Sequence, residues 1–240
     1  MITQETSAEQ ITANAKAVIS RIAAACARAG RDPAQVELLA VTKYAGPAQI
    51  RALLETGLAR HAGESRMQGA AEKWSSPELA GLRAGVTLHF LGHLQSNKAA
   101  KAASFFDAID SVDSMEAARV LSRKAAEAGR KLPVLIQVKL TEKETQSGVS
   151  AAEAAALVQE TAKLEGLSPR GYMAIAPVTS DPEELRPYFR AVKRLFDADF
   201  ARPAAPDSKN YLSLGMTHDF EIAVEEGSNL PRIGSAIFGN

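Results

Sequence analysis

The sequence Glu-Leu-Leu-Ala-Val-Thr-Lys at residues 37–43 is the stretch that best indicates how this chain folds. Its apolar residues are typical of a buried strand, and the Tyr-Ala-Gly-Pro that follows predicts a turn into a helix. Lys43 therefore stands at a strand end, where barrels of alternating strands and helices carry their chemistry. A lysine beside an apolar wall can lose its proton and attack a carbonyl. The alternative is an ordinary solvated lysine at a strand end.

The same strand-then-helix pattern recurs along the whole chain. Strands are predicted at residues 36–42, 60–63, 87–91, 106–109, 133–140, 170–175, 211–214 and 230–233. Helices are predicted at residues 47–56, 66–74, 96–103, 114–128, 151–164, 180–200 and 217–226, with a short element starting at Gly234. An amphipathic helix over residues 7–28 comes before the first strand, and Pro187 should delay the first turns of the helix at 180–200.

This repeat predicts a single α/β domain over residues 1–240. Eight units of about 30 residues match the size of one strand–helix repeat. They favour a (β/α)8 TIM barrel with an extra N-terminal helix. An open doubly wound sheet is the alternative, because repeat length alone does not distinguish a closed sheet from an open one.

Composition excludes several classes of protein. Among 240 residues, Lys+Arg and Asp+Glu each number 28, so no net charge draws the chain to nucleic acid or to an anionic membrane. The single cysteine, Cys26, forms no internal disulfide and is expected in the core, which fits a reducing cytoplasm. The sequence shows no run of about 18 apolar residues that would span a membrane. It shows no signal-peptide layout and no metal-ligand spacing either. No long exposed apolar helix face is evident either, so we expect a monomer.

Two segments near the C-terminus predict a phosphate site. In such barrels the loops after strands seven and eight often bind phosphate. Ser213 and Thr217 supply hydroxyls after strand seven, and Gly215 allows close backbone approach. Thr217 is also a candidate N-cap for the helix at 217–226. Gly234 and Ser235 follow strand eight, and ordinary turn and cap chemistry is the alternative for both segments.

Arg232 is expected to point into the same barrel mouth, because it lies two residues before Gly234 on an alternating strand. There it could pair with a ring nitrogen or carboxylate, or form a salt bridge to a barrel acid. Lys43, the phosphate site and an inward arginine together suggest pyridoxal phosphate, held as a lysine aldimine (Schiff base). A charged arginine at the pyridine nitrogen disfavours protonation of the ring and so weakens it as an electron sink.

With these residues identified, the chain resembles the pyridoxal-phosphate homeostasis proteins of the proline-synthetase-cotranscribed type. The resemblance covers nearly the whole chain. Its motifs are Leu39-Ala-Val-Thr-Lys43, His89-Phe-Leu-Gly-His-Leu-Gln-Ser-Asn-Lys98, Gly171-Tyr-Met-Ala-Ile175, Leu212-Ser-Leu-Gly-Met-Thr217 and Arg232-Ile-Gly-Ser-Ala-Ile-Phe-Gly239.

The resemblance implies a barrel like the N-terminal half of alanine racemases and a part in vitamin B6 homeostasis. It also implies a role for each site residue: Lys43 as the Schiff-base lysine, Arg232 at the ring nitrogen, Met173 near the ring, and Ser213, Thr217, Gly234 and Ser235 on the phosphate. Five positions depart from the family pattern: Ser65 replaces an asparagine, Gly69 a glutamate, His93 a proline, Lys139 an asparagine and Gln146 a lysine.

Three functions remain open from the sequence. The favoured one is a non-catalytic carrier that holds pyridoxal phosphate and passes it to apo-enzymes. A weak pyridoxal-phosphate-dependent amino-acid racemase is the alternative. Racemisation needs an acid and a base on opposite faces of the substrate. Lys43 serves one face, and alanine racemases take the other group from a tyrosine on a partner subunit's second domain, for which this chain shows no segment. A sugar-phosphate barrel enzyme is the third possibility, and it would leave Lys43 and Arg232 unused.

Overall fold

The computed structural model describes residues 6–141, 146–202 and 208–239, and its core is an eight-stranded sheet. The strands are β1 (Leu39–Val41), β2 (His61–Glu64), β3 (Thr87–Phe90), β4 (Ala108–Val112), β5 (Leu132–Val138), β6 (Leu167–Ala174), β7 (Tyr211–Ser213) and β8 (Arg232–Ile233). The α-helices are α1 (Ala8–Arg28), α2 (Pro47–Glu55), α3 (Met67–Trp74), α4 (Pro77–Ala80), α5 (Ser96–Phe105), α6 (Met115–Glu127), α7 (Ala151–Ala162), α8 (Arg186–Asp199), α9 (Phe220–Glu225) and α10 (Ser235–Phe238).

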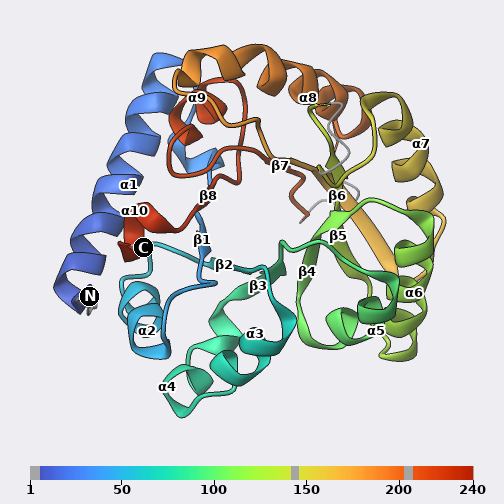
Figure 1. The fold of residues 1–240 in the computed structure, drawn as a ribbon, viewed down its shortest axis with the longest axis horizontal. Helices are drawn as coiled ribbons and strands as arrows, with labels where there is room; N and C mark the ends of the chain where they lie inside the picture. Colours follow the sequence, from blue (N-terminus) through green and yellow to red (C-terminus); the bar gives the residue numbers. More distant parts are fainter. Residues whose placement is uncertain (1–5, 142–145, 203–207, 240) are drawn as a thin grey trace.

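All strand pairs are parallel, and each strand from β1 to β7 pairs with the next in sequence. β1 also pairs with β8, so the sheet curves back on itself and the doubly wound alternative is wrong. No ladder joins β7 to β8, but Arg232 N donates to Gly215 O at 3.0 Å across this gap. The result is a nearly closed (β/α)8 barrel with helices around the outside, as predicted (Figure 1).

The predicted N-terminal helix is confirmed as α1, which lies along the outside of the barrel beside α9 and α10 (Figure 1). Ser7 caps it by accepting a hydrogen bond from Gln10 N. Its apolar stripe, which includes Ile11, Val18 and Ile22, is buried against the barrel. Cys26 is fully buried on the same face, as expected of a small core residue.

Three local predictions need comment. Pro187 delays the helix at 180–200 as expected, because a 3₁₀ turn over Pro182–Leu185 comes before α8. The predicted helix start at Thr217 is wrong: a turn first brings Asp219 N onto Met216 O, and α9 begins at Phe220 with Asp219 as its cap. The short helix α4 was not predicted. The sequence also predicts loops at residues 141–148 and 202–209, and residues 142–145 and 203–207 of these lie outside the described residues.

Within those described ranges, every helix is too short or too polar to cross a lipid bilayer. The same part of the chain holds no group of three or more His, Cys, Asp or Glu side chains placed to bind a metal ion.

A chain of ionisable side chains crosses the lower half of the barrel, toward the amino-terminal ends of the strands. Glu37 Oε2 lies 3.4 Å from His61 Nε2, His61 Nδ1 lies 2.9 Å from His89 Nε2, and His89 Nδ1 lies 2.8 Å from Asp110 Oδ1. We call these four residues the base network. His61, His89 and Asp110 are buried, so the network links β2, β3 and β4 inside the barrel.

The base network predicts an acid-sensitive contribution to stability. The hydrogen bond from His61 lowers the pKa of Glu37 to about 2, from an ordinary 4.5. Because the folded pKa is lowered, this stabilisation is present above about pH 4.5 and is lost as pH falls toward 2. The Glu37 side chain is 38% exposed, so after allowance for solvent screening we expect a loss of about 1 kcal/mol.

Urea unfolding at pH 5 and pH 3 tests this prediction. Between these two pH values, the free energy of unfolding should fall more for the wild type than for Glu37→Gln. Glu72→Gln, at an exposed position of α3, is the control and should follow the wild type. Equal acid sensitivity of the wild type and Glu37→Gln would contradict the assignment.

Candidate functional site

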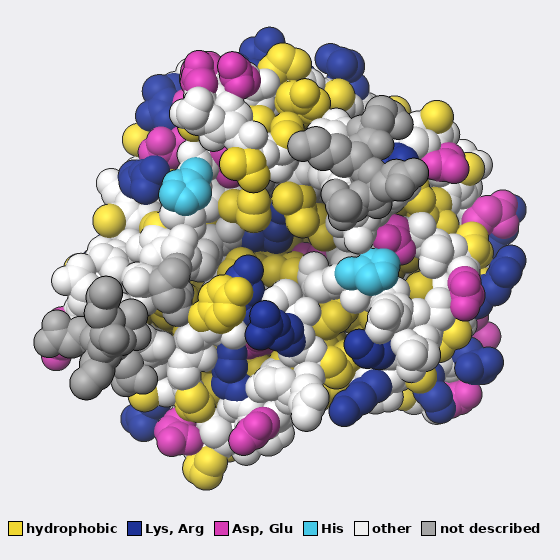
Figure 2. All heavy atoms as spheres, in the orientation of Figure 1, with side chains coloured by type: hydrophobic (Ala, Val, Ile, Leu, Met, Phe, Trp, Pro, Cys, Tyr) yellow, Lys and Arg dark blue, Asp and Glu magenta, His cyan; other side chains and the backbone are white. Residues whose placement is uncertain are grey.

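A pocket of about 390 Å³ lies at the carboxyl ends of the strands, where parallel barrels place their sites. Figure 2 shows this face, with a hollow near its centre where hydrophobic and basic side chains meet. We call it the Lys43 pocket. Its lining residues are Val41, Lys43, Tyr44, Ser65, Leu91, Met173, Ile175, Met216, Thr217, His218, Arg232, Gly234 and Ser235.

Lys43 lies at the mouth of this pocket, two residues beyond the end of β1. Its side chain is exposed, not shielded by an apolar wall as the sequence suggested. Its Nζ lies 5.0 Å from the centre of the Tyr44 ring, which is itself 60% exposed. No carboxylate among the described residues forms an ion pair with Lys43. The amine is therefore accessible to a small molecule that enters the pocket.

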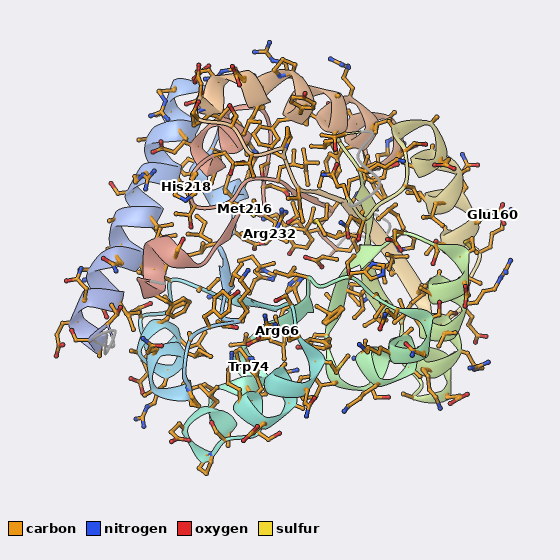
Figure 3. All side chains as sticks on the ribbon, viewed as in Figure 1. Arg66, Trp74, Glu160, Met216, His218 and Arg232 are labelled. Atoms are coloured by element: carbon orange, nitrogen blue, oxygen red, sulfur yellow. The ribbon has the colours of Figure 1, made fainter. Side chains whose placement is uncertain are left out.

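A buried set of hydrogen bonds fixes the end of β1 and so positions Lys43. The Oε1 atom of Glu64 accepts from Thr42 Oγ1 at 2.7 Å, Lys73 Nζ at 3.0 Å and Trp74 Nε1 at 3.1 Å. Lys73 Nζ also donates to the carbonyl oxygen of Thr42 at 2.6 Å. Figure 3 labels Trp74 on α3, the helix that supplies two of these donors. The backbone immediately before Lys43 is thus tied to both β2 and α3.

Replacing Glu64 by glutamine should destabilise the protein. The glutamine keeps one acceptor oxygen but leaves the Lys73 ammonium without its partner, and the Lys73 side chain is only 13% exposed. Breaking one side of such a buried pair is expected to lower the free energy of unfolding by about 3 kcal/mol. Urea unfolding measures this. Glu55→Gln is the control: it removes an exposed ion pair with Arg51 and should leave the midpoint of urea unfolding unchanged. Equal effects of Glu64→Gln and Glu55→Gln would contradict the argument.

Arg232 projects into the pocket from β8, on the same side of the barrel as Met216 and His218 (Figure 3). Its Nη1 donates to Ser213 O at 2.6 Å and to Ser213 Oγ at 3.0 Å, and its Nη2 donates to Ala174 O at 2.9 Å. Burial lowers its pKa to about 10, so the guanidinium stays charged at neutral pH. No carboxylate within the described ranges forms an ion pair with it, which leaves the salt-bridge alternative unsupported.

Thr217, Gly234 and Ser235 come together at the end of the pocket near β7 and β8. The Thr217 and Ser235 hydroxyl oxygens lie 3.0 Å apart, and Thr217 Oγ1 also accepts from Ala236 N. Gly215, at φ +88°, lets the chain turn tightly toward this point. Two adjacent hydroxyls beside glycine backbone can donate to an anion.

Ser213 does not line the pocket, although the sequence suggested that it binds phosphate. Its side chain is fully buried, and its hydroxyl donates to Leu230 O at 3.0 Å while it accepts from Arg232. Ser213 therefore helps to close the gap between β7 and β8 and holds the guanidinium in place.

Met173 lines the pocket, as the resemblance implied, and so does Ser65. The other four departures from the family pattern, Gly69 included, lie outside the lining. Gln146 accepts from Leu140 N and Thr141 N and donates to Ile175 O, so it ties the loop after β5 to the end of β6. His93 Nδ1 lies 3.2 Å from Ser147 Oγ, and Lys139 N donates to Val149 O.

Several apolar lining residues were not singled out from the sequence: Val41, Leu91, Ile175 and Met216. Leu91 and Ile175 each lie directly after a strand, so strand-end position was the signal that could have identified them.

The fold and the pocket define a barrel with a lysine beyond the first strand and two loops after the last two strands that carry hydroxyl groups and glycines. Residues 13–240 match the family model described as "Alanine racemase, N-terminal domain". The "Pyridoxal phosphate homeostasis protein" of Aquifex aeolicus is 35% identical over 92% of this chain and 94% of its own length. The protein of the same name from Escherichia coli is 34% identical over 95% of this chain and 96% of its own length. This chain belongs to the pyridoxal phosphate homeostasis protein family.

Solved structures agree with this assignment. A protein of unknown function from Bifidobacterium adolescentis is 34% identical, with a TM-score of 0.86 over 96% of this chain and 95% of its own. PipY of Synechococcus elongatus, solved with PLP bound, is 35% identical, with a TM-score of 0.75 over 92% of this chain and 100% of its own. An alanine racemase of Clostridium difficile, 16% identical over 58% of its own chain, shares the fold alone (TM-score 0.65).

Proposed function

We propose that this protein binds pyridoxal 5'-phosphate in the Lys43 pocket, holds it through a covalent bond to Lys43 and so takes part in vitamin B6 homeostasis. The observation that carries the proposal is the convergence of three chemistries on one cavity: an accessible amine, a buried guanidinium and a pair of hydroxyls beside glycine. PLP is bound in PipY, and the relatives' names support the same cofactor here.

The residues present fit this cofactor. Bound there, it would supply an aldehyde that condenses with a primary amine and a ring that accepts electrons. Lys43 would hold the aldehyde carbon, and Thr217, Gly234 and Ser235 would hold the phosphate. Arg232 would face the ring nitrogen and Met173 would cover the ring. Ser213 would act through Arg232, because its hydroxyl contacts the guanidinium and lies outside the pocket lining.

Arg232 supports a carrier in preference to a catalyst. A guanidinium donates hydrogen bonds and has no acceptor, so it cannot hold a proton on the ring nitrogen. Three of its hydrogen bonds to Ser213 and Ala174 fix its position, and its pKa of about 10 keeps it charged at neutral pH. An unprotonated ring withdraws electrons weakly, which leaves carbanion chemistry at a bound amino acid slow.

A weak racemase is the second candidate, because Tyr44 and His218 both line the pocket and could transfer protons opposite Lys43. A general acid or base must be held in position to act well. Within the described ranges, no hydrogen bond from another side chain holds either Tyr44 or His218. Because the Tyr44 and His218 side chains are not held in position, the structure favours a carrier over a racemase. The exposed mouth of the pocket at Lys43 would allow release of the cofactor to apo-enzymes. We further propose that the carrier acts as a monomer.

Borohydride reduction tests the cofactor assignment. The purified protein, incubated with pyridoxal phosphate, is reduced, digested and analysed by peptide mass spectrometry. We expect one stoichiometric pyridoxyl group on the peptide that contains Lys43. A label spread over several exposed lysines, or none on Lys43, would overturn the proposal and favour a sugar-phosphate ligand for the same anion site.

Exchange of the α-proton distinguishes the carrier from the racemase. The loaded protein is incubated with L- and D-alanine in deuterated water and followed by proton NMR. We expect no exchange beyond that given by free pyridoxal phosphate at equal concentration. Rapid exchange with inversion at the α-carbon would remove the carrier and establish a racemase.

A further inference from the structure

A second pocket, of about 260 Å³, lies at the opposite end of the barrel, where the strands begin. We call it the base pocket. Thr87, Ala108 and Tyr211, which are among its lining residues, each begin a strand. Its volume is just below the ~300–1,000 Å³ typical of small-molecule sites, and far above the space that one water needs. A small metabolite is therefore the size class that it fits.

Two charged side chains that line the base pocket keep a buried polar atom without a partner. Asp110 is fully buried, and its Oδ2 accepts no hydrogen bond from any described residue. Nη1 of Arg170 is buried and likewise makes no hydrogen bond within the described ranges. Buried groups of this kind are almost always satisfied in native proteins. Both residues are among the lining of the same cavity, so one unmet acceptor and one unmet donor belong to its wall.

The histidines of the base network leave no free ring nitrogen for a ligand. Each of the four ring nitrogens already faces Glu37, Asp110 or the other ring. Lys209 is also engaged, because its Nζ lies 3.2 Å from Glu37 Oε2.

The rest of the lining limits the kind of ligand. Three apolar residues also line the base pocket and are buried: Ala108, Val134 and Leu135. A ligand that satisfied both groups would carry an anionic acceptor for Arg170 and a cationic donor for Asp110, next to a small apolar part.

We propose that the base pocket binds a small aliphatic α-amino acid, whose carboxylate accepts from Arg170 Nη1 and whose ammonium donates to Asp110 Oδ2. The site is separate from the Lys43 pocket and does not depend on the function proposed above. It would let the free amino-acid level affect the barrel from the end remote from the cofactor.

Isothermal titration of the protein with alanine tests the proposal, with propionate and ethylamine as probes that each carry one of the two charges. We expect saturable binding of alanine and at least roughly tenfold weaker binding of either single-charge probe, since each loses one charge-assisted hydrogen bond. Arg170→Met and Asp110→Asn should weaken alanine binding by a similar factor. Arg194→Met, at an exposed position on α8, is the matched control and should bind like the wild type.

The variant Lys43→Ala separates the two pockets, because alanine can also react with a cofactor held at Lys43. Unchanged binding of alanine to this variant supports the base pocket, and loss of binding overturns it. The proposal is also overturned if titration of the wild type with alanine gives no saturable heat signal, or if alanine and propionate bind equally well. Should Asp110→Asn fail to fold, the probe series and Arg170→Met still decide.

Discussion

Replacing Lys43 by alanine is expected to abolish covalent attachment of pyridoxal phosphate altogether. The exposed Nζ of Lys43 is the primary amine that the structure places at the mouth of the pocket that holds Arg232 and Thr217. Without that amine the aldehyde has no partner in the pocket, although the residues proposed to hold the phosphate remain. After incubation with the cofactor, borohydride reduction and intact-mass measurement should show no pyridoxyl adduct. The fold should be unaffected, because the lysine side chain is exposed and forms no ion pair within the described residues.

Two further variants make this result specific. Lys101→Ala removes an exposed lysine from α5 and should leave the adduct at its wild-type level. Lys43→Arg keeps the positive charge but offers a guanidinium, which stays protonated and does not condense; it should lose the adduct as completely as Lys43→Ala. A full adduct on either Lys43 variant would show that another amine holds the cofactor.

Replacing Gly171 by alanine is expected to have the largest effect on stability. Gly171 lies on β6 at φ +143°, a conformation that L-residues rarely adopt. An added Cβ would lie 1.8 Å from Tyr211 O, the strand residue with which Gly171 is in register on β7. The two strands would have to separate next to the residues that hold Arg232. We expect a loss of about 4 kcal/mol from backbone strain and overpacking together.

Urea unfolding of Gly171→Ala measures this loss, and Gly57→Ala is its matched control. Gly57 also has a positive φ, +69°, but no atom lies within 4 Å of the Cβ that alanine would add. Gly57→Ala should therefore lower the free energy of unfolding only through backbone strain, by about 1 kcal/mol. Equal losses in the two variants would show that the close contact with β7 is relieved at little expense.

Much of the fold could be predicted from the sequence because local patterns set each element. The apolar run that ends at Val41, the cap at Ser7 and the effect of Pro187 depend on neighbours only a few residues away. The start of α9 could not be predicted in the same way. Thr217 has the chemistry of an N-cap, but Asp219 and the carbonyl of Met216 form a turn that postpones the helix.

The residues predicted for the site are brought together by the fold, and their roles stay predictions. Lys43, Met173, Thr217, Arg232, Gly234 and Ser235 all line one pocket. Ser213 has the same chemistry as Thr217, yet a single strand position decides that its hydroxyl faces Arg232 and not the cavity.

By itself, the sequence determined the order of strands and helices, the family and the chemical types available at the barrel mouth, because these follow from local periodicity and residue identity. Only the tertiary structure decided that β1 pairs with β8, that three donors meet on Glu64 Oε1, and that Asp110 and Arg170 line one cavity. Each of these two residues keeps one buried polar atom that makes no hydrogen bond within the described residues. Those relations join residues far apart in the chain, and closure of the barrel is what brings them within contact distance.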